Sequence, residues 1–190
     1  MVDEGKELLT RFTQTEETGG ANTPPESRLL LFALAVSIRA KDILELGFDL
    51  GYTTRVLALT GARVVGVDNN QDYPSFKGVP NEQLAAYPNI TTVAMDTLAY
   101  LKDVPDNSFD LIFVDDSHQP EHVAAEATRV YHILRPGGIA AFHDTKNPVD
   151  NGQMIDRIFA DWQRLHLPAI SPYRGQLGCD YGLSIVRKPG

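Results

Sequence analysis

The sequence predicts an α/β fold, a doubly wound and mostly parallel sheet of about seven strands with an antiparallel strand near the C-terminus. Two observations lead to this prediction. Short apolar, β-branched runs alternate with helical segments, which is typical of parallel strands covered by helices on both faces. The runs also end in polar or acidic residues, and such sheets bind ligands at the carboxyl ends of their strands.

The individual elements follow from apolar runs and from the residues that start and stop helices. The expected strands are residues 42–46, 63–68, 89–95, 110–115, 139–144 and 182–186. The expected helices are residues 28–39, 52–60, 97–101 with Asp96 as N-cap, 121–134 and 154–165. Residues 69–88 are polar and rich in proline, so they are expected to form a loop with a short helix.

Length and charge narrow the possible functions. Residues 1–190 are expected to form one domain, in which residues 1–22 are an N-terminal helical extension. The net charge of -8 and the lack of a Lys/Arg cluster argue against a nucleic-acid partner. The apolar run 29–36 is too short to span a membrane. The single cysteine, Cys179, suits a reducing cytoplasm, which is the expected location.

A glycine turn joins the first strand to the helix that follows it. Gly47 and Gly51 lie four residues apart, between an apolar run and a helix start, which is the pattern of a nucleotide-binding corner. Asp49 stands where a dinucleotide motif has its middle glycine, so the turn disfavours a diphosphate and tolerates an ammonium or sulfonium ligand. Asp68 lies 21 residues beyond Gly47, at a spacing suited to binding ribose hydroxyls.

These motifs resemble those of class I S-adenosylmethionine-dependent methyltransferases. Residues 43–54 are similar to motif I of the catechol O-methyltransferase-like group, and residues 65–68 to the motif after it. Residues 96–97 are similar to the adenine-side motif, and residues 134–138 to the turn before strand five. The segment 109–118 is similar to metal-dependent sugar and small-molecule O-methyltransferases. The resemblance implies a Rossmann-like fold.

The resemblance also implies roles for individual residues. The implied S-adenosylmethionine ligands are Glu45, Gly47, Asp49, Gly51, Thr53, Asp68, Asn69, Asp96, Thr97 and Asp115. The implied ligands of a divalent metal are Asp115, His143 and Asp144, and His118 stands where relatives carry a general base. The family commonly has acidic or amide ligands, so the imidazole of His143 shifts the expected metal from Mg²⁺ toward Mn²⁺ and later transition metals.

The expected reaction is methyl transfer to a hydroxyl of a small molecule, with sugars among the candidate acceptors. A divalent cation lowers the pKa of a hydroxyl, and His118 can take its proton. A homo-oligomer is one expectation, because a second subunit could complete the acceptor pocket; the N-terminal segment is the other candidate. Two rival functions stay open, an NAD(P)-dependent oxidoreductase and a non-catalytic S-adenosylmethionine-binding module. The missing middle glycine and the lack of a Tyr-x-x-x-Lys pair count against the oxidoreductase.

Structural roles are the alternative for the same side chains. Asp115 and Asp116 could cap the next helix, His118 could be a surface residue, and His143 with Asp144 could form a buried polar pair. Residues 118–122 also match the H-x-x-E-H pattern of zinc proteases. That pattern needs both histidines on one helical face, whereas a proline two residues after His118 indicates that the helix begins there.

Overall fold

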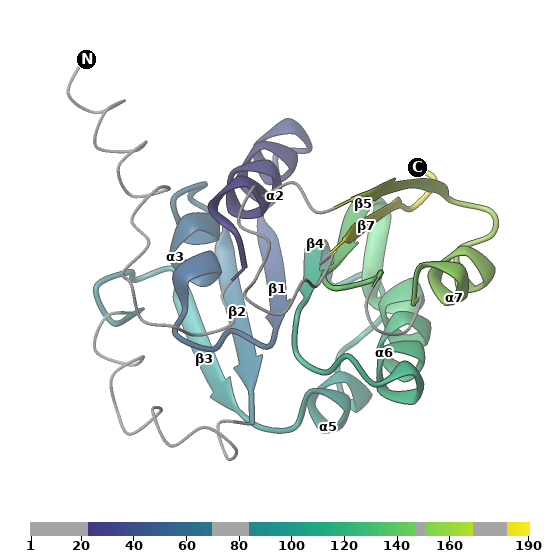
Figure 1. The fold of residues 1–190 in the computed structure, drawn as a ribbon. Helices are drawn as coiled ribbons and strands as arrows, with labels where there is room; N and C mark the ends of the chain where they lie inside the picture. Colours follow the sequence, from purple (N-terminus) through teal and green to yellow (C-terminus); the bar gives the residue numbers. More distant parts are fainter. Residues whose placement is uncertain (1–22, 70–83, 147–150, 169–181) are drawn as a thin grey trace.

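The computed structural model describes residues 23–69, 84–146, 151–168 and 182–190, which contain one seven-stranded sheet between helices (Figure 1). Its strands are β1 (Asp42–Leu46), β2 (Arg63–Asp68), β3 (Ile90–Ala94), β4 (Phe109–Val114), β5 (Leu134–Phe142), β6 (Gln163–Leu167) and β7 (Leu183–Arg187). The strand order is β3-β2-β1-β4-β5-β7-β6, with β1 to β5 parallel and β7 antiparallel to both of its neighbours. The predicted fold class is therefore confirmed. The expected extension 1–22 and most of the expected loop 69–88 lie outside the described residues.

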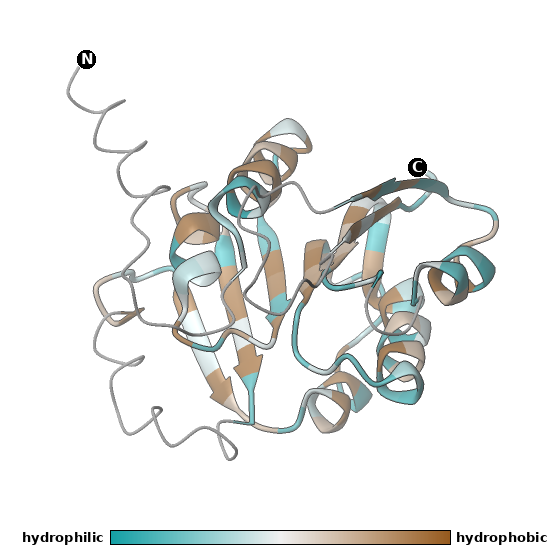
Figure 2. Cartoon of the chain, in the orientation of Figure 1, coloured by the Kyte–Doolittle hydropathy of each residue, from teal (hydrophilic) through white to brown (hydrophobic). Residues whose placement is uncertain are grey.

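Helices cover both faces of the sheet, which makes it doubly wound (Figure 1). They are α2 (Pro25–Ser37), α3 (Tyr52–Ala58), α5 (Thr97–Lys102), α6 (Pro120–Ile133) and α7 (Asn151–Ile158). Successive strand residues point to opposite faces, so Ile43 packs with α2 and α3, whereas Leu44 packs in the core that includes α5, α6 and α7. Much of the central sheet is brown in Figure 2, and the apolar residues of β1, β4 and the end of β5 are buried, as expected for strands covered on both faces.

The expected helix 154–165 is wrong in its second half. Helix α7 ends at Ile158, and Gln163–Leu167 instead forms the edge strand β6, which pairs antiparallel with β7. The guanidinium of Arg164 donates to the carbonyls of Phe159 and Ala160 at 2.6 Å each, and these bonds hold the turn between α7 and β6. Pairing with β7 decides the structure here, and no local pattern in residues 163–167 announces it.

The turn expected before strand five is also different. Helix α6 ends at Ile133, one residue earlier than expected, and the chain becomes extended at Leu134. The residues 135–138 then belong to β5, which is longer than expected and ends at Phe142. A Cβ on Gly138 would lie 2.8 Å from the carbonyl oxygen of Asp110, so this glycine lets β4 and β5 approach.

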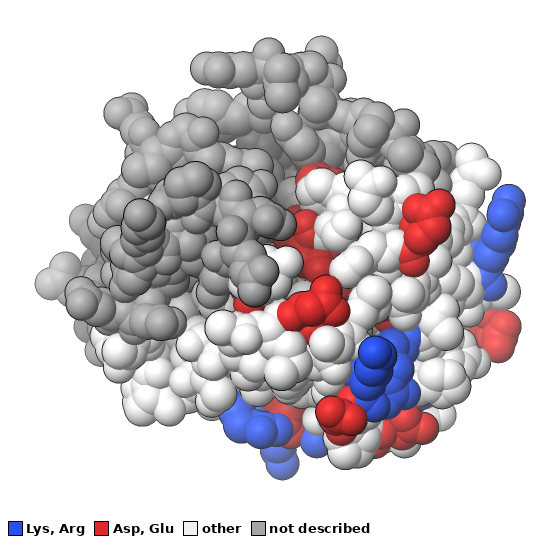
Figure 3. Space-filling view, turned by 90° about the horizontal axis from the view of Figure 1, so that it is seen from below, with Lys and Arg blue, Asp and Glu red and all other residues white. Residues whose placement is uncertain are grey.

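The parallel strands bring their carboxyl ends to one edge of the sheet. The arrows of β1, β2 and β3 point downward in Figure 1, and Figure 3 views the molecule from that side. Acidic side chains gather near the centre of this view, and Lys and Arg side chains lie toward its lower and right-hand parts (Figure 3). In the part of the chain that the structure describes, no helix has the length and apolar character needed to cross a membrane.

Candidate functional site

The glycine corner after β1 is packed directly on the end of β4. Gly47 has a φ of 79°, and its N–H donates to the carbonyl of Val67 at 2.8 Å. A Cβ at this position would lie 2.4 Å from the carbonyl oxygen of Asp115 and 2.5 Å from the Cα of Asp116. Only glycine satisfies both conditions, because it tolerates positive φ and leaves room for another backbone. The corner therefore holds the ends of β1, β2 and β4 together.

The turn itself is closed by backbone bonds to a carboxylate and a carbonyl. The N–H of Asp49 donates to Oδ2 of Asp68 at 3.0 Å, and the N–H of Gly51 donates to the carbonyl of Phe48 at 2.6 Å. Asp49 and Gly51 both have positive φ, 41° and 73°. Burial, followed by the nearby Asp68, raises the pKa of Asp49. Asp68 is thus fixed at the end of β2 facing the turn, where a ribose was expected.

Glu45 is an acid inside the sheet, directly before the corner. It is 1% exposed, and burial raises its pKa to about 8, with the charges of Asp115 and Asp68 adding to the shift. The side chain is therefore mostly neutral at pH 7. Thr53, in the first turn of α3, is buried as well. The expected contacts of these two residues with a cofactor stay predictions.

The expected adenine-side residues make structural contacts. Oδ1 of Asp96 accepts from the N–H of Ala99 at 2.8 Å, so Asp96 is the N-cap of α5, as its sequence position predicts. The hydroxyl of Thr97 donates to Oδ2 of Asp116 at 2.7 Å. Asn69 lies exposed just after β2. Binding of an adenine by these three residues stays a prediction.

Four of the predicted residues form one charged cluster at the ends of β4 and β5. His143 Nδ1 lies 3.0 Å from Oδ1 of Asp115 and 3.2 Å from Oδ1 of Asp144. His118 Nε2, from the loop before α6, lies 3.1 Å from Oδ2 of Asp144. Asp144 has a φ of 52°, an uncommon conformation for a residue other than glycine. We call these residues, Asp115, His118, His143 and Asp144, the rim cluster.

His143 offsets part of the negative charge of the rim cluster. Burial lowers the pKa of this imidazole, but the carboxylates of Asp115 and Asp144 outweigh burial and raise it to about 10. The ring is therefore an imidazolium between two acids. Its Nε2 is buried and has no hydrogen-bond partner among the described residues.

The rim cluster has donors suited to a divalent metal. Ligand atoms of Asp115, His118 and Asp144 lie within 4.8 Å of one another, and two carboxylates with one imidazole suit Mn²⁺ and similar ions. This set contains His118 where the sequence suggested His143, and His143 forms ion pairs with the same two carboxylates. The geometry therefore offers His118 two roles, metal ligand or general base.

Thr23 also belongs to the site, although no sequence motif indicates it. Its hydroxyl donates to Oδ2 of Asp115 at 2.7 Å, across 92 residues of sequence. The carbonyl of Thr23 accepts from Nε of Arg28 at 2.9 Å, which ties the start of α2 to the rim cluster. A threonine before Pro24 reads as a helix start, and only the fold shows what its hydroxyl contacts.

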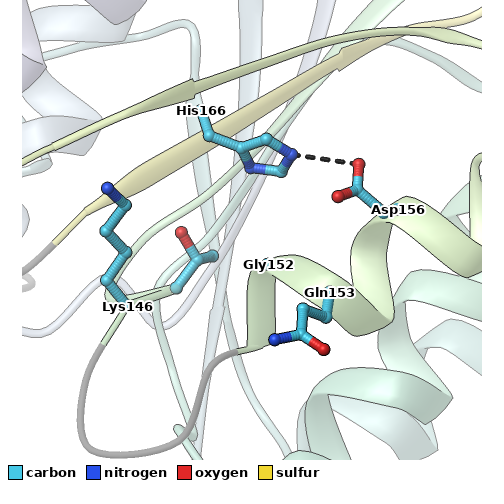
Figure 4. Close-up of a pocket in the computed structure, with 6 residues that line it drawn as sticks. Lys146, Gly152, Gln153, Asp156 and His166 are labelled. Carbon is cyan, nitrogen blue, oxygen red and sulfur yellow. Dashed lines mark hydrogen bonds and ion pairs between the residues drawn. The ribbon is translucent and has the colours of Figure 1, made fainter.

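A pocket of about 240 Å³ lies beside the rim cluster, lined by Thr145, Lys146, Gly152, Gln153, Asp156 and His166 (Figure 4). His166 lies 3.0 Å from Oδ1 of Asp156 and 2.7 Å from the hydroxyl of Ser184, which donates to Thr145 at 2.8 Å. The order of groups is that of a Ser-His-Asp triad. Ser184 is 0% exposed, so it cannot meet a substrate and the network is structural. Thr145 follows Asp144, which makes this pocket a candidate acceptor site.

The two histidines of the H-x-x-E-H pattern face different partners. Helix α6 begins at Pro120, so His118 precedes it and contacts Asp144, whereas His122 contacts Asp116. A protease-type metal site would need both imidazoles on one helical face. The geometry does not provide one.

Comparison with known proteins identifies a protein family that matches this chain. A family described as a methyltransferase domain matches residues 44–145, more than half of the chain. No curated protein matches the sequence. The structure is similar to a putative O-methyltransferase from Klebsiella pneumoniae, with a TM-score of 0.70 and 19% identity over 100% of this chain and 90% of that one.

Two further structures are similar. O-methyltransferase TomG from Streptomyces achromogenes, involved in tomaymycin synthesis and solved in complex with SAM, has a TM-score of 0.67 and 20% identity over 97% of this chain and 89% of that one. N-methyltransferase NodS from Bradyrhizobium japonicum WM9 has a TM-score of 0.66 and 19% identity over 87% of this chain and 96% of that one. At these identities the likeness shows a shared fold. The match to residues 44–145, which include both the glycine corner and the rim cluster, shows that this chain belongs to the methyltransferase domain family.

Proposed function

We propose that this protein transfers a methyl group from S-adenosylmethionine to a hydroxyl of a small molecule, with sugars among the candidate acceptors. The observation that carries the proposal is the packing of Gly47 on Asp115, which sets the glycine corner against the rim cluster. A donor held at the corner would then lie beside groups able to hold an acceptor and remove its proton. Membership of the methyltransferase domain family and the O-methyltransferase neighbours support this assignment.

The corner has the features that a sulfonium nucleoside requires. Gly47, Asp49 and Gly51 form a turn with positive φ, and Asp68 at the end of β2 is suited to accept hydrogen bonds from a ribose. The acids Asp49 and Asp115 give the site negative charge, which favours a cationic ligand. S-adenosylmethionine, when bound, supplies an electrophilic methyl group on sulfur. The neighbour TomG was solved with this compound.

His118 is our candidate for the general base. It is 44% exposed on its side chain, so it can meet an acceptor, and Nε2 lies 3.1 Å from Oδ2 of Asp144. When Nε2–H donates to this carboxylate, Nδ1 carries the lone pair that can take the proton of a hydroxyl. Asp144 would orient the ring and stabilise its charge.

The metal is a separate part of the proposal. Asp115 and Asp144 would hold it with an imidazole as third ligand, a donor set that fits Mg²⁺ less well than Mn²⁺ or a similar ion. Binding through Nε2 of His118 would replace the hydrogen bond to Asp144 that the base role uses, so ligand and base are alternative roles of this side chain. A bound divalent cation would lower the pKa of the acceptor hydroxyl. The imidazolium of His143 already neutralises one of the two carboxylate charges, so a metal would have to compete with that positive charge.

The acceptor atom could be an amine nitrogen instead of a hydroxyl oxygen. One similar structure is an N-methyltransferase, so the shared fold accommodates amine acceptors as well as hydroxyls. A neutral amine attacks through its own lone pair, whereas a hydroxyl is a weak nucleophile until a base removes its proton. A base beside a candidate metal site therefore favours the hydroxyl.

We also propose a cytoplasmic location and a homo-oligomer that completes the acceptor pocket.

The first experiment is calorimetric titration of the protein with S-adenosylhomocysteine and, separately, with NAD⁺. We expect binding of the first compound alone; binding of NAD⁺ alone would favour the rival oxidoreductase and defeat the proposal. The second experiment measures release of S-adenosylhomocysteine from S-adenosylmethionine with catechols, sugars and amines as acceptors. Release with amines alone would overturn the hydroxyl assignment, and binding without turnover in any acceptor class would favour a non-catalytic module.

A further inference from the structure

A second group of ionisable side chains lies next to the rim cluster but shares no residue with it. Asp116 follows β4, and His122 and Glu126 lie four residues apart on α6, so both project from one side of that helix. Nε2 of His122 lies 3.1 Å from Oδ2 of Asp116 and 3.5 Å from Oε1 of Glu126. One ligand atom from each side chain falls within 4.8 Å of the other two.

Glu126 is the feature that a structural explanation leaves open. Its side chain is 0% exposed, and neither carboxylate oxygen has a hydrogen-bond partner among the described residues. Its nearest charged group is Nε2 of His122, 3.5 Å from Oε1, and burying a carboxyl group without a hydrogen bond costs a few kcal/mol. Oε1 points toward His122, and the other two members of the group are partly accessible, with Asp116 16% and His122 23% exposed.

Two of the three separations between donor atoms match those around a small metal ion, and the third lies within 4.8 Å. Zinc bonds to nitrogen and carboxylate oxygen are about 2.0–2.1 Å long, so two ligands of a tetrahedral ion lie about 3.3 Å apart. The two observed separations, 3.1 and 3.5 Å, lie on either side of that value. An imidazole with two carboxylates is a donor set that Zn²⁺ and neighbouring first-row metals accept.

We propose that Asp116, His122 and Glu126 form a binding site for a divalent first-row transition metal ion, with Zn²⁺ as the best fit. The ion would bind Oδ2 of Asp116, Nε2 of His122 and Oε1 of Glu126, and it would give the buried carboxylate a closer partner than the imidazole of His122. It would also join the loop after β4 to α6. The hydroxyl of Thr97, 2.7 Å from Oδ2 of Asp116, holds that ligand in place from α5.

The competing state has a proton in place of the metal. The neighbouring Glu126, ahead of Asp116, raises the pKa of His122 to about 9. An imidazolium could therefore satisfy the acids without any ion, and the experiment must tell the two states apart.

The test measures zinc bound after equilibrium dialysis, in a protein whose rim cluster is disabled by Asp144→Asn. We expect one equivalent of Zn²⁺ to remain bound in this background. Adding Glu126→Gln should weaken zinc binding by about 100-fold or more, since loss even of an outer partner of a metal ligand costs roughly 10- to 100-fold. Adding Glu121→Gln, which changes an exposed glutamate of the same helix, should leave binding unchanged.

Co²⁺ gives a second readout, because its visible absorption reports a nitrogen and oxygen ligand sphere directly. We expect this absorption in the Asp144→Asn protein and its loss in the Glu126→Gln double variant. If that variant does not fold, His122→Gln replaces it. Absence of bound zinc in the Asp144→Asn protein, or equal binding with and without Glu126, would overturn the proposal. S-adenosylhomocysteine binding by the unmodified protein is independent of this result, so the methyltransferase proposal is tested separately.

Discussion

The backbone N–H of Asp49 donates to the carboxylate of Asp68 across 3.0 Å, so the residue expected to bind a ribose also closes the glycine turn. One carboxylate thereby connects the ends of β1 and β2. A ligand that uses Asp68 would meet a side chain already oriented by the backbone, which lowers the entropy cost of binding. The geometry of the turn and the affinity for a nucleoside should therefore depend on the same residue.

Replacing Asp68 tests this connection. We expect Asp68→Ala to weaken S-adenosylhomocysteine binding by about 1.5–3 kcal/mol, the range for hydrogen bonds to a charged group. Isothermal titration calorimetry measures the change, and Asp103→Ala, at an exposed position after α5, serves as the control. An Asp68→Ala protein that binds as tightly as the unmodified one would remove Asp68 from the cofactor site.

Two glycines with similar backbone angles allow the cost of a left-handed conformation to be measured apart from the cost of a steric overlap. Gly47 has a φ of 79° and Gly61 a φ of 81°, but a Cβ on Gly61 would meet nothing within 4 Å. Gly61→Ala should lower the free energy of unfolding by about 1–2 kcal/mol, which is the cost of placing alanine in the left-handed conformation. Gly47→Ala should cost at least about 2 kcal/mol more, because its Cβ would overlap the backbone of Asp115. Urea unfolding of both variants gives the comparison, and equal losses of stability would contradict it.

The central sheet was predictable because buried parallel strands carry a strong local signal. Residues 64–67 and 111–114 are buried and carry no polar side chain, and residues 43–46 are buried and apolar except for Glu45, so burial on both faces leaves nearly continuous apolar runs in the sequence. Strand β6 lacks such a signal, since residues 163–165 are exposed and only the partner strand β7 specifies its conformation. The end of β5 could be placed, but its start at Leu134 depends on pairing with Phe109.

Prediction of the site had a similar limit. Residues that end parallel strands, such as Asp115 and Asp144, could be brought to one edge by topology alone. The orientation of a side chain could not be read in this way, so the geometry suggests His118 as third member of the metal-donor set where the sequence suggested His143; which imidazole binds a metal stays a prediction. Thr23 approaches Asp115 only through the packing of α2, and Asp116 approaches His122 only through the bend after β4. These contacts depend on tertiary structure.

Removing the imidazole of His118 tests its role as base. We expect His118→Gln to lower the rate of methyl transfer by roughly 10²–10⁴-fold, the usual contribution of a general base, while the affinity for S-adenosylhomocysteine stays within about twofold. His132→Gln, at an exposed position of α6, should leave the rate unchanged. A His118→Gln protein with full activity would assign the proton to another acceptor.

Removing the metal is a distinct test of the rim cluster. We expect a chelator, or Asp144→Asn, to abolish methyl transfer to a hydroxyl and to spare S-adenosylhomocysteine binding, because the glycine corner does not include Asp144. Added Mn²⁺ should restore activity after chelation but leave Asp144→Asn inactive. Full activity in the chelator would take the metal out of the mechanism.

The buried acid Glu45 should make stability depend on pH. Its pKa is about 8 in the folded protein and 4.5 in an exposed chain, so the folded state holds this proton more tightly than the unfolded state does. Below the lower value both states are protonated and Glu45 costs nothing. As the pH rises between the two values, the unfolded state ionises first and is favoured, so the free energy of unfolding falls; above the higher value the loss is complete.

Glu45→Gln removes this titration and keeps the shape of the side chain. In the absence of cofactor, we expect the variant to gain little stability near pH 4.5 and a few kcal/mol relative to the unmodified protein near pH 8. Urea unfolding across this range measures the difference, and Glu121→Gln on the surface of α6 controls for loss of one charge. A gain of equal size at both ends of the range would mean that Glu45 keeps an ordinary pKa, and that the acid beneath the glycine corner is ionised in the folded protein.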